Sequence, residues 1–384
     1  MNISSSFSNT HAATHAKAIL HDSAGMPTLE LGNRPLSFFE FWPTWLFYAP
    51  VFVAVILFSL RFRGLTLPTI TNPTFSGGGF IGESKSQILD LARQHLGDKV
   101  APFICFTRTA TSAATETQTV EAALHEAGLS YPIVAKPDQG CRGAGVQPVY
   151  SSSQLTRYLE QFPANAAVVL QKMVACEGEA GVFYVREPHE SKGRIISLTL
   201  KYFPYVLGNG NATLRELIEI DPRASALNHI YLPRFSDRLN SIPAKDERVR
   251  LAFAGNHSKG TIFRNGNDLI TPQMEAMFDH LSQKIPGFYF GRYDIRFDDF
   301  TQLQAGIEDF TILEINGSGA EVTHIWDART SLWQAWRDVI AQYYLVYKIG
   351  AYNRNRHTNR PNVAELWSAF NLEKSQTKLY PPTH

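Results

Sequence analysis

The stretch YPIVAKPDQGCRGAGVQPVY, residues 131–150, narrows the choice among phosphate-binding folds. An apolar run ends at Lys136, a loop with three glycines follows, and a second apolar run begins almost at once. The glycines are Gly140, Gly143 and Gly145. Their G-x-x-G-x-G spacing is not that of a dinucleotide fold, and Pro148 prevents a helix from starting at the loop and running on. The P-loop signature, in which a first glycine is followed after four residues by Gly-Lys-Ser/Thr, is absent as well.

This glycine loop is therefore predicted to join two strands. Its backbone amides can form an anion nest that folds over phosphates, with Lys136 at the end of the first strand beside them. The alternative is an ordinary glycine hairpin with a surface lysine, and the loop alone does not separate the two.

The bulk composition excludes some functional classes. The chain has 384 residues, enough for more than one structural unit, and its 36 basic and 35 acidic residues give a formal net charge of +1. This balance offers no strong positive field, so nucleic acid is not an expected partner. The three cysteines lie far apart without a CxxC pair. That pattern argues against a disulfide framework or structural zinc and suits a reducing compartment.

One segment differs from the otherwise soluble composition. FWPTWLFYAPVFVAVILFSL, residues 41–60, has no charge and the length of one bilayer crossing. Aromatic residues that resemble an interfacial belt lie near one end: Trp42, Trp45 and Tyr48. Arg61 and Arg63 follow, so we predict a single transmembrane helix with the next domain in the cytoplasm. A buried or re-entrant hairpin is the alternative, because Pro43 and Pro50 interrupt the helical pattern.

The rest of the chain divides by composition. From residue 132 to about 350, strands are expected to alternate with helices in an α+β domain. The predicted divisions are a flexible tail (1–37), a membrane segment (38–63), a linker (64–84), the main domain (85–350) and a peripheral tail (351–384).

Two later strands carry polar residues at two-residue spacing, which places them on one strand face. GRYDIRF carries Arg292, Asp294 and Arg296, and LEING carries Glu314 and Asn316. Asp294, Glu314 and Asn316 supply oxygen donors suited to a magnesium ion that bridges nucleotide phosphates. Paired polar residues at a sheet edge are the alternative. The strand that carries Glu314 and Asn316 is otherwise apolar, and charged groups in such a strand need partners. This requirement favours the metal site.

The order VAKP, GxxGxGV, LQKMV, GE, GRYDIRF, LEING resembles the ATP-grasp superfamily, in particular D-alanine–D-alanine ligase and similar carboxylate–amine ligases, over roughly residues 85 to 345. The resemblance implies two α+β subdomains that grip ATP between two antiparallel sheets. Lys136 would then contact the α and β phosphates, with the loop at 140–145 closing over them. The implied adenine contacts are Gln171, Lys172 and Val174, and Glu179 would lie at the ribose.

The same resemblance implies the catalytic groups. Asp294, Glu314 and Asn316 match the magnesium ligands, and Lys201 matches a further phosphate-binding lysine. Arg292 and the glycine turn 317–319, with Gly319, match groups that stabilise a tetrahedral intermediate.

The expected activity is therefore an ATP- and magnesium-dependent ligase that activates a small-molecule carboxylate as an acyl phosphate for attack by an amine. A small-molecule kinase and a membrane-tethered ATP sensor without turnover are the alternatives. Two departures from the family stand out. Only roughly 70 residues separate the membrane segment from Lys136, too few for the family's usual amino-terminal βαβ domain. NGSGAEVTH also replaces the proline-containing turn of dipeptide-forming ligases, so D-alanine specificity is not expected.

Overall fold

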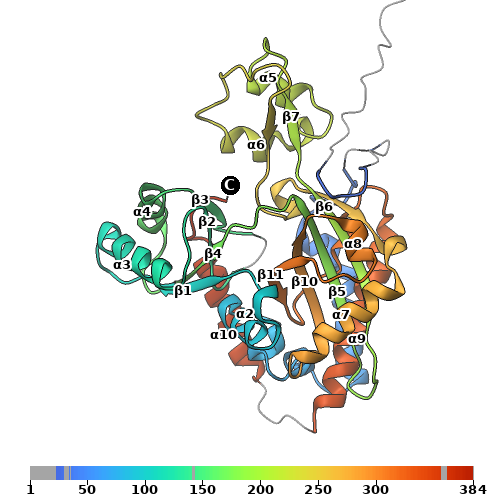
Figure 1. Cartoon of the computed structure of the whole chain (residues 1–384). Helices are drawn as coiled ribbons and strands as arrows, with labels where there is room; N and C mark the ends of the chain where they lie inside the picture. Colours follow the sequence, from blue (N-terminus) through green and yellow to red (C-terminus); the bar gives the residue numbers. More distant parts are fainter. Residues whose placement is uncertain (1–22, 30–33, 35, 141–142, 356–360, 384) are drawn as a thin grey trace, which may run out of the picture.

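The computed structural model of the protein describes residues 23–29, 34, 36–140, 143–355 and 361–383. Two antiparallel sheets with helices packed on them form the body of the molecule (Figure 1). The architecture therefore mixes helices and strands, as the sequence predicts. Short 3-10 helices occur at Leu67–Ile70 (η1), Ser76–Gly79 (η2), Gly97–Lys99 (η3), Ser225–Leu227 (η4), His257–Lys259 (η5), Asn267–Leu269 (η6) and Thr323–Trp326 (η7).

The smaller sheet carries the lysine and the glycine loop. Its strands, in the order β1-β4-β2-β3, are β1 (Phe103–Thr107), β4 (Ala167–Lys172), β2 (Ile133–Pro137) and β3 (Gln147–Val149). Helices α3 (Ala113–Glu126) and α4 (Ser152–Gln161) pack on it through an apolar core that includes Val120 and Leu155. The glycine loop joins β2 to β3 without an intervening helix, which confirms the prediction made from Pro148.

The larger sheet has the order β11-β10-β5-β6-β9. Its strands are β5 (Gly178–Val185), β6 (Arg194–Tyr202), β9 (Ile262–Asn265), β10 (Phe290–Phe297) and β11 (Phe310–Asn316). Helices α2 (Lys85–Leu96) and α7 (Pro272–Lys284) cover one face, where Leu89 and Phe278 share a core with Tyr184. Gly97 ends α2, as the sequence predicts. The short α8 (Phe300–Gln304) follows β10.

The opposite face of the larger sheet is divided between an apolar and a polar end. Helix α9 (Leu332–Asn353) covers the apolar end, where Val339 and Val346 pack in one cluster with Phe183, Val185 and Phe290. The polar end carries the charged side chains of β5, β6, β10 and β11 and faces the smaller sheet. Side chains alternate between the two faces of each strand, so the same sheet contributes residues to the core and to the site.

A small lobe lies between β6 and β9 and stands away from both sheets (Figure 1). It contains β7 (Tyr205–Leu207), β8 (Arg248–Arg250), α5 (Leu214–Ile220) and α6 (Asn228–Arg234). Its own apolar cluster includes Leu214, Ile218 and Tyr231. The sequence analysis did not separate this lobe from the main domain.

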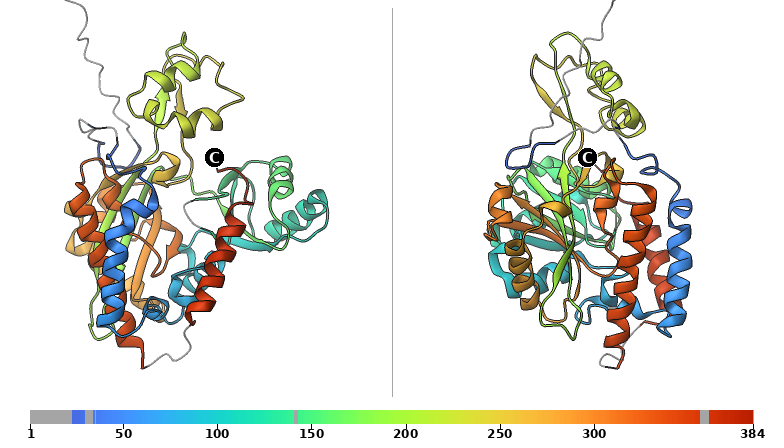
Figure 2. Two further views of the ribbon diagram at one scale, coloured as in Figure 1. Left: turned by 180° about the vertical axis from the view of Figure 1, so that it is seen from behind. Right: turned by 90° about the vertical axis from the view of Figure 1, so that its right-hand side faces the viewer.

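Among the described residues, one helix, α1 (Thr44–Arg61), is long and apolar enough to cross a membrane by length and composition. The helix is continuous through Pro50 and begins after Pro43, so the hairpin alternative is wrong. It does not stand apart from the domain, because it lies beside α9 along its length (Figure 2).

The segment predicted as a linker, 64–84, is a folded part of the domain. Asn72 is fully buried; its Nδ2 donates to the Phe290 carbonyl at 2.7 Å and its Oδ1 accepts from the Phe290 N–H at 3.0 Å. These bonds hold the segment against the start of β10. The predicted tail 1–37 lies largely outside the described residues, but Leu29 is buried in the main core and the Tyr202 hydroxyl donates to the Pro27 carbonyl.

Within the predicted peripheral tail, 351–384, the described residues 351–355 and 361–383 also contact the rest of the fold. Helix α9 continues to Asn353, and α10 (Val363–Thr377) returns between the two sheets (Figure 2). Beyond α10, the Tyr380 hydroxyl donates to the Gln139 carbonyl at 2.8 Å, and Thr383 Oγ1 donates to the Gly143 carbonyl at 2.8 Å. We call residues 363–383 the C-terminal strap, because they hold the glycine loop from outside.

Candidate active site

The polar face of the larger sheet is built by strand register. Asp294 of β10 lies opposite Glu314 of β11 and Gly181 of β5, and Glu179 of β5 lies opposite Lys201 of β6. Residues directly opposite one another in a sheet share a face. Six charged residues and one amide, from four strands, therefore meet on one surface: Glu179, Lys201, Arg292, Asp294, Arg296, Glu314 and Asn316.

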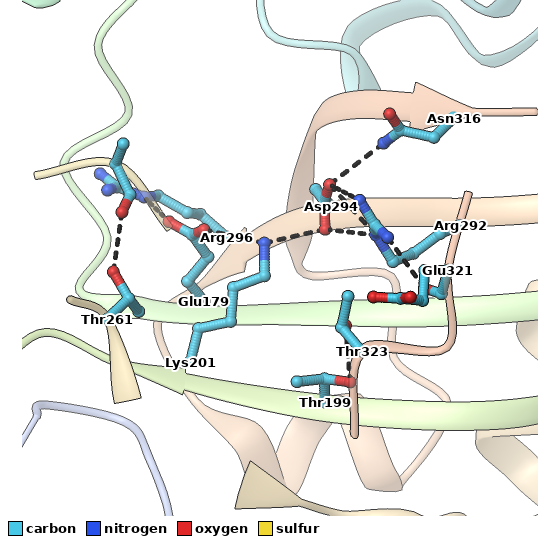
Figure 3. A network of polar contacts seen from close by, with 11 residues as sticks. Glu179, Thr199, Lys201, Thr261, Arg292, Asp294, Arg296, Asn316, Glu321 and Thr323 are labelled. Atoms are coloured by element: carbon cyan, nitrogen blue, oxygen red, sulfur yellow. Dashed lines mark hydrogen bonds and ion pairs between the residues drawn. The ribbon is translucent and has the colours of Figure 1, made fainter. Parts of the chain in front are cut away.

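Asp294 is the centre of this network (Figure 3). Its Oδ1 accepts from Lys201 Nζ at 2.8 Å and from Arg292 Nε at 3.2 Å, and its Oδ2 accepts from Asn316 Nδ2 at 3.2 Å. Burial by itself raises the pKa of Asp294, but the charges of Arg292 and Lys201 outweigh it and lower the pKa to about 2. The carboxylate therefore stays ionised throughout the neutral range.

Gly181 keeps this centre open. A Cβ at that position would lie 3.1 Å from Arg292 Cδ and 3.3 Å from Asp294 Oδ1. A larger residue there would crowd both side chains, so the strand carries its smallest residue beside the buried ion pair.

Lys136 of the smaller sheet bonds to a β-bulge in the larger sheet. The register of β10 and β11 shifts after Asp294, so that Leu313 is the extra residue. Its carbonyl accepts from Lys136 Nζ at 3.0 Å and from Gln171 Nε2 at 3.3 Å, and Lys136 Nζ also donates to Gln171 Oε1 at 2.9 Å. Burial lowers the pKa of Lys136 to about 8, against the attraction of Glu314.

The glycine loop adopts backbone conformations that favour glycine. Gly140, Gly143 and Gly145 have φ values of 140°, 69° and 70°. Gly140 and Gly143 line the cavity described below, but Gly145 does not. A Cβ on Gly145 would lie 2.8 Å from Pro137 and 3.1 Å from Tyr380, so this glycine allows close packing behind the loop. Cys141 and Arg142 lie outside the described residues.

One cavity of about 800 Å³ opens between the sheets and brings together the predicted site residues with the exception of Gly145. They are Lys136, Gly140, Gly143, Gln171, Lys172, Val174, Glu179, Lys201, Arg292, Asp294, Glu314, Asn316 and Gly319. These residues come from positions nearly 200 apart in the sequence, yet they face one space.

Two residues that the sequence analysis missed lie in the same cavity, in and beside the segment predicted as a linker. Lys85 Nζ donates to the Gly140 carbonyl at 2.6 Å and lies 3.7 Å from Glu314 Oε1. Glu83 accepts from the Gly317 N–H at 2.8 Å, and burial raises its pKa to about 8. The sequence GESK, residues 82–85, follows a glycine turn. Its pattern is that of an ordinary helix start at Ser84, so it gave no sign that Glu83 and Lys85 belong to the site.

The glycine turn 317–319 differs from the role that the family resemblance implies. The Ser318 N–H donates to the Gly78 carbonyl at 3.0 Å, and the Gly319 N–H donates to the Gly79 carbonyl at 2.7 Å. With Gly317 bound to Glu83, the three N–H groups are all engaged inside the protein. The turn therefore docks the 77–83 segment, and we do not assign Gly319 to catalysis.

Glu179 also differs from its implied position at a ribose. Its Oε1 accepts from Lys201 Nζ at 3.2 Å and its Oε2 from Arg296 Nε at 3.1 Å. A Cβ built on Gly255 would lie 1.8 Å from Glu179 Oε1, so the backbone at 255 covers the carboxylate. Arg296 Nη1 further donates to the Val174 carbonyl at 2.7 Å. In this arrangement Glu179 orients Lys201 and Arg296.

The remaining groups fit magnesium and nucleotide phosphates by their chemistry. Asp294 and Glu314 offer carboxylate oxygens and Asn316 an amide oxygen, which are the donors that a hard cation prefers. Lys85, Lys136 and Lys201 place three ammonium groups around the same space. The buried carboxylate of Asp294 is ionised and so retains the charge that a cation needs.

Comparison with known proteins gives a limited result. The sequence matches no protein-family model and no curated protein. Its three-dimensional structure does match solved structures. The matching structures are ATP-grasp ligases.

The bifunctional glutathione synthetase from Pasteurella multocida matches with 18% identity and a TM-score of 0.33, over 70% of this chain and 38% of that protein. A D-Ala:D-Ser ligase from Enterococcus faecalis has 13% identity and a TM-score of 0.38, over 68% and 61%. The D-alanine–D-alanine ligase from Bacillus anthracis has 12% identity and a TM-score of 0.37, over 71% and 68%. The chain thus spans under two thirds of the first two proteins.

Proposed function

We propose that this protein is an ATP- and magnesium-dependent ligase that activates a carboxylate as an acyl phosphate for attack by an amine. One observation carries the proposal: the ammonium groups of Lys85, Lys136 and Lys201 and the guanidinium of Arg292 line the same cavity as the oxygen donors Asp294, Glu314 and Asn316. Phosphoryl transfer needs cations around the transferring oxygens and little covalent help from the protein. The residue set matches that need.

Each group has a role that follows from its position. Asp294, Glu314 and Asn316 would hold magnesium, which when bound neutralises charge on the phosphates. Lys136 and Lys201 would bind phosphate oxygens, and Lys85 joins them beside the glycine loop. The loop at 140–145 would exclude water, because an acyl phosphate hydrolyses readily.

Arg292 would act on the reacting acyl group. It is held from two sides, since its Nη1 donates to the Glu321 carbonyl at 2.9 Å and its Nε to Asp294. Burial lowers its pKa, but Asp294 outweighs burial and the net shift is upward, so the guanidinium stays charged. A fixed positive charge in a buried site stabilises negative charge that develops during attack.

The adenine contacts remain part of this proposal. Gln171, Lys172 and Val174 line the cavity at the end of β4, where backbone groups can pair with a base edge. The turn NGSGAEVTH gives no reason to propose D-alanine as substrate.

The test is ATP-dependent formation of a hydroxamate in the presence of hydroxylamine, which traps acyl phosphates. Purified full-length protein, ATP, magnesium and a panel of carboxylates would be followed for ADP, phosphate and hydroxamate. Glu314→Gln is expected to slow ADP formation by roughly 100-fold or more, because it removes a magnesium ligand. The matched control is Glu308→Gln. Glu308 is an acidic residue just before β11 and lies outside the cavity, so its substitution should leave the rate unchanged.

Two outcomes would contradict the ligase proposal. A stable phosphorylated product without hydroxamate would favour a kinase. ATP binding without ADP formation in any substrate mixture would favour a sensor. Arg292→Ala separates binding from chemistry, since it should reduce turnover while ATP affinity changes little.

A further inference from the structure

The outer face of α1 is apolar along its whole length. From Thr44 to Leu60 the helix carries no charged residue. The residues on its outer face are large and exposed: Trp45 (74%), Phe52 (65%), Val53 (56%), Ile56 (44%), Leu57 (58%) and Leu60 (70%). A continuous apolar stripe of this kind is rare on a soluble monomer and marks an interaction surface.

The inner face of α1 is fixed to the domain at both ends. Near its beginning, Phe47 is buried and its carbonyl accepts from Trp336 Nε1 at 2.8 Å. Near its end, Ser59 Oγ lies 2.9 Å from the Tyr347 hydroxyl. Both contacts are made to α9, which runs beside α1 (Figure 2). An upright span would need α1 to leave α9, which would expose Phe47 and Val51 and the apolar cluster under them.

Helix α9 extends the same apolar surface. Its Trp333 is 77% exposed and its Tyr344 is 36% exposed. A hollow of about 720 Å³ lies between the two helices, lined by Pro50, Phe58, Trp336 and Ile340, with Arg194 and Arg337 also on its wall. Its apolar lining is suited to an acyl chain, whereas Arg194 and Arg337 already pair with Glu190 and Asp338.

Basic residues without acidic partners mark one end of the surface. Arg61 and Arg63 are exposed at the end of α1, and among the described residues neither forms an ion pair with a carboxylate. Trp45 lies at the other end of the same face. Arginine beside an apolar stripe complements an anionic lipid surface, and tryptophan prefers the headgroup level.

We propose that α1, together with Trp333 and Tyr344 of α9, binds the surface of an anionic bilayer with the helix axis parallel to the membrane plane. The outer face of α1 enters the boundary between headgroups and acyl chains of a single leaflet, while its inner face stays on the domain. Both ends of α1 then lie on one side of the membrane. This inference does not depend on the ligase proposal.

The binding test uses the full chain and vesicles of phosphatidylcholine with and without phosphatidylglycerol. The native protein is expected to float with anionic vesicles, and Phe52→Glu with Leu60→Glu should reduce the bound fraction at least tenfold. The control is Ile220→Glu with Ile242→Glu, which introduces the same charges at two exposed apolar residues of the small lobe. An unchanged melting temperature would show that the charged variants are folded.

The topology test uses single-cysteine variants in a background in which the three native cysteines are serine. Thr44→Cys and Leu65→Cys flank α1, and both residues are exposed. In inside-out membrane vesicles, an impermeant maleimide should label both positions without detergent. Protection of one position until detergent is added would establish a span and overturn the proposal. Failure to float, combined with a dimer that Phe52→Glu dissociates, would overturn it in favour of self-association.

Discussion

At the scale of single residues, the site depends on charges held in buried surroundings. Lys136 and Lys201 are both less than a tenth exposed, yet their pKa values shift in opposite directions. Lys201 contacts two carboxylates, which overcome the effect of burial and raise its pKa. Lys136 bonds only to neutral oxygens, so burial dominates and lowers its pKa. Of these two lysines, Lys136 is the one that lacks a direct anionic partner, as a phosphate-binding group would.

The first residue-scale prediction is a loss of ATP affinity in Lys136→Ala. Removing a charge-assisted contact to phosphate should weaken magnesium-ATP binding by about 1.5–3 kcal/mol, measured by titration calorimetry. Lys192→Ala, a substitution of an exposed lysine far from the cavity, is the control and should bind as the native protein does. Equal affinity in both variants would mean that the loop after β2 is only a hairpin.

The pH dependence of the same binding follows from the lowered pKa. Because the pKa of Lys136 is about 8, its ammonium is largely protonated below pH 8 and becomes neutral above it. ATP affinity should therefore fall as the pH rises through about 8, by up to tenfold per pH unit. Calorimetric titrations from pH 6.5 to 9.5 would measure this, and a flat profile in the native protein would refute it.

At the scale of elements, segments outside the predicted domain complete the cavity. The turn at 77–79 docks on the turn at 317–319 through backbone bonds, and the C-terminal strap holds the glycine loop. Segments from outside the predicted domain therefore help to enclose the site.

Gly79→Ala tests the docked turn. Gly79 has φ 68°, and an added Cβ would lie 2.7 Å from Gly317 Cα. Strain and overpacking together should lower the free energy of unfolding by on the order of 2–4 kcal/mol. Gly77→Ala is the matched control, because Gly77 has φ 53° but an added Cβ would meet no atom within 4 Å, leaving only a backbone cost of about 1 kcal/mol. Denaturant unfolding of both variants would reveal equal losses if the docking were unimportant.

Tyr380→Ala tests the C-terminal strap. The Tyr380 ring stacks on Phe162 with centroids 5.3 Å apart, and its hydroxyl bonds to Gln139 beside the loop. The substitution should increase hydrogen exchange of the amides at 138–146, since the loop loses its outer support. Leu379→Ala removes a neighbouring side chain that is 62% exposed and should leave exchange unchanged. Identical exchange in the two variants would count against a role for the strap.

At the scale of the whole molecule, Glu40 joins three parts that are separate in the sequence. It precedes α1, lies 3.5 Å from Arg223 of the small lobe and 4.0 Å from His257 beside the cavity. Burial raises its pKa to about 7, despite the opposing charge of Arg223. Among the described residues its Oε2 has no hydrogen-bond partner. The surroundings of Glu40 therefore favour its protonated carboxyl group.

The consequence is a loss of stability as the pH rises. Between about pH 4.5 and 7 the unfolded chain has released the Glu40 proton while the folded chain retains it, so the free energy of unfolding should fall by up to about 3 kcal/mol and then level off. Glu40→Gln cannot ionise and should lose this part of the pH dependence, becoming more stable than the native protein at pH 8 and equal to it near pH 4. Calorimetric melting at both pH values measures the difference, and parallel curves would contradict the assignment.

The sequence by itself determined features that depend on neighbours in the chain. Pro148 excludes a helix after the glycine loop, and two-residue spacing puts Arg292 and Asp294 on one strand face. These predictions held because backbone geometry alone fixes them: proline lacks an N–H, and side chains alternate along a strand. The charge-free stretch 41–60 likewise predicted a helix, which α1 confirms.

Only the tertiary structure decided which of these elements meet. Three contacts join residues that are about 180 to 290 positions apart: Lys136 with the bulge at Leu313, Glu83 with Gly317, and α1 with α9. Such contacts depend on how whole faces pack, and many segments of similar composition could satisfy the same local pattern. The physical reason is that hydrophobic burial is non-directional: it requires that an apolar face be covered, and the competing surfaces of the complete fold select what covers it.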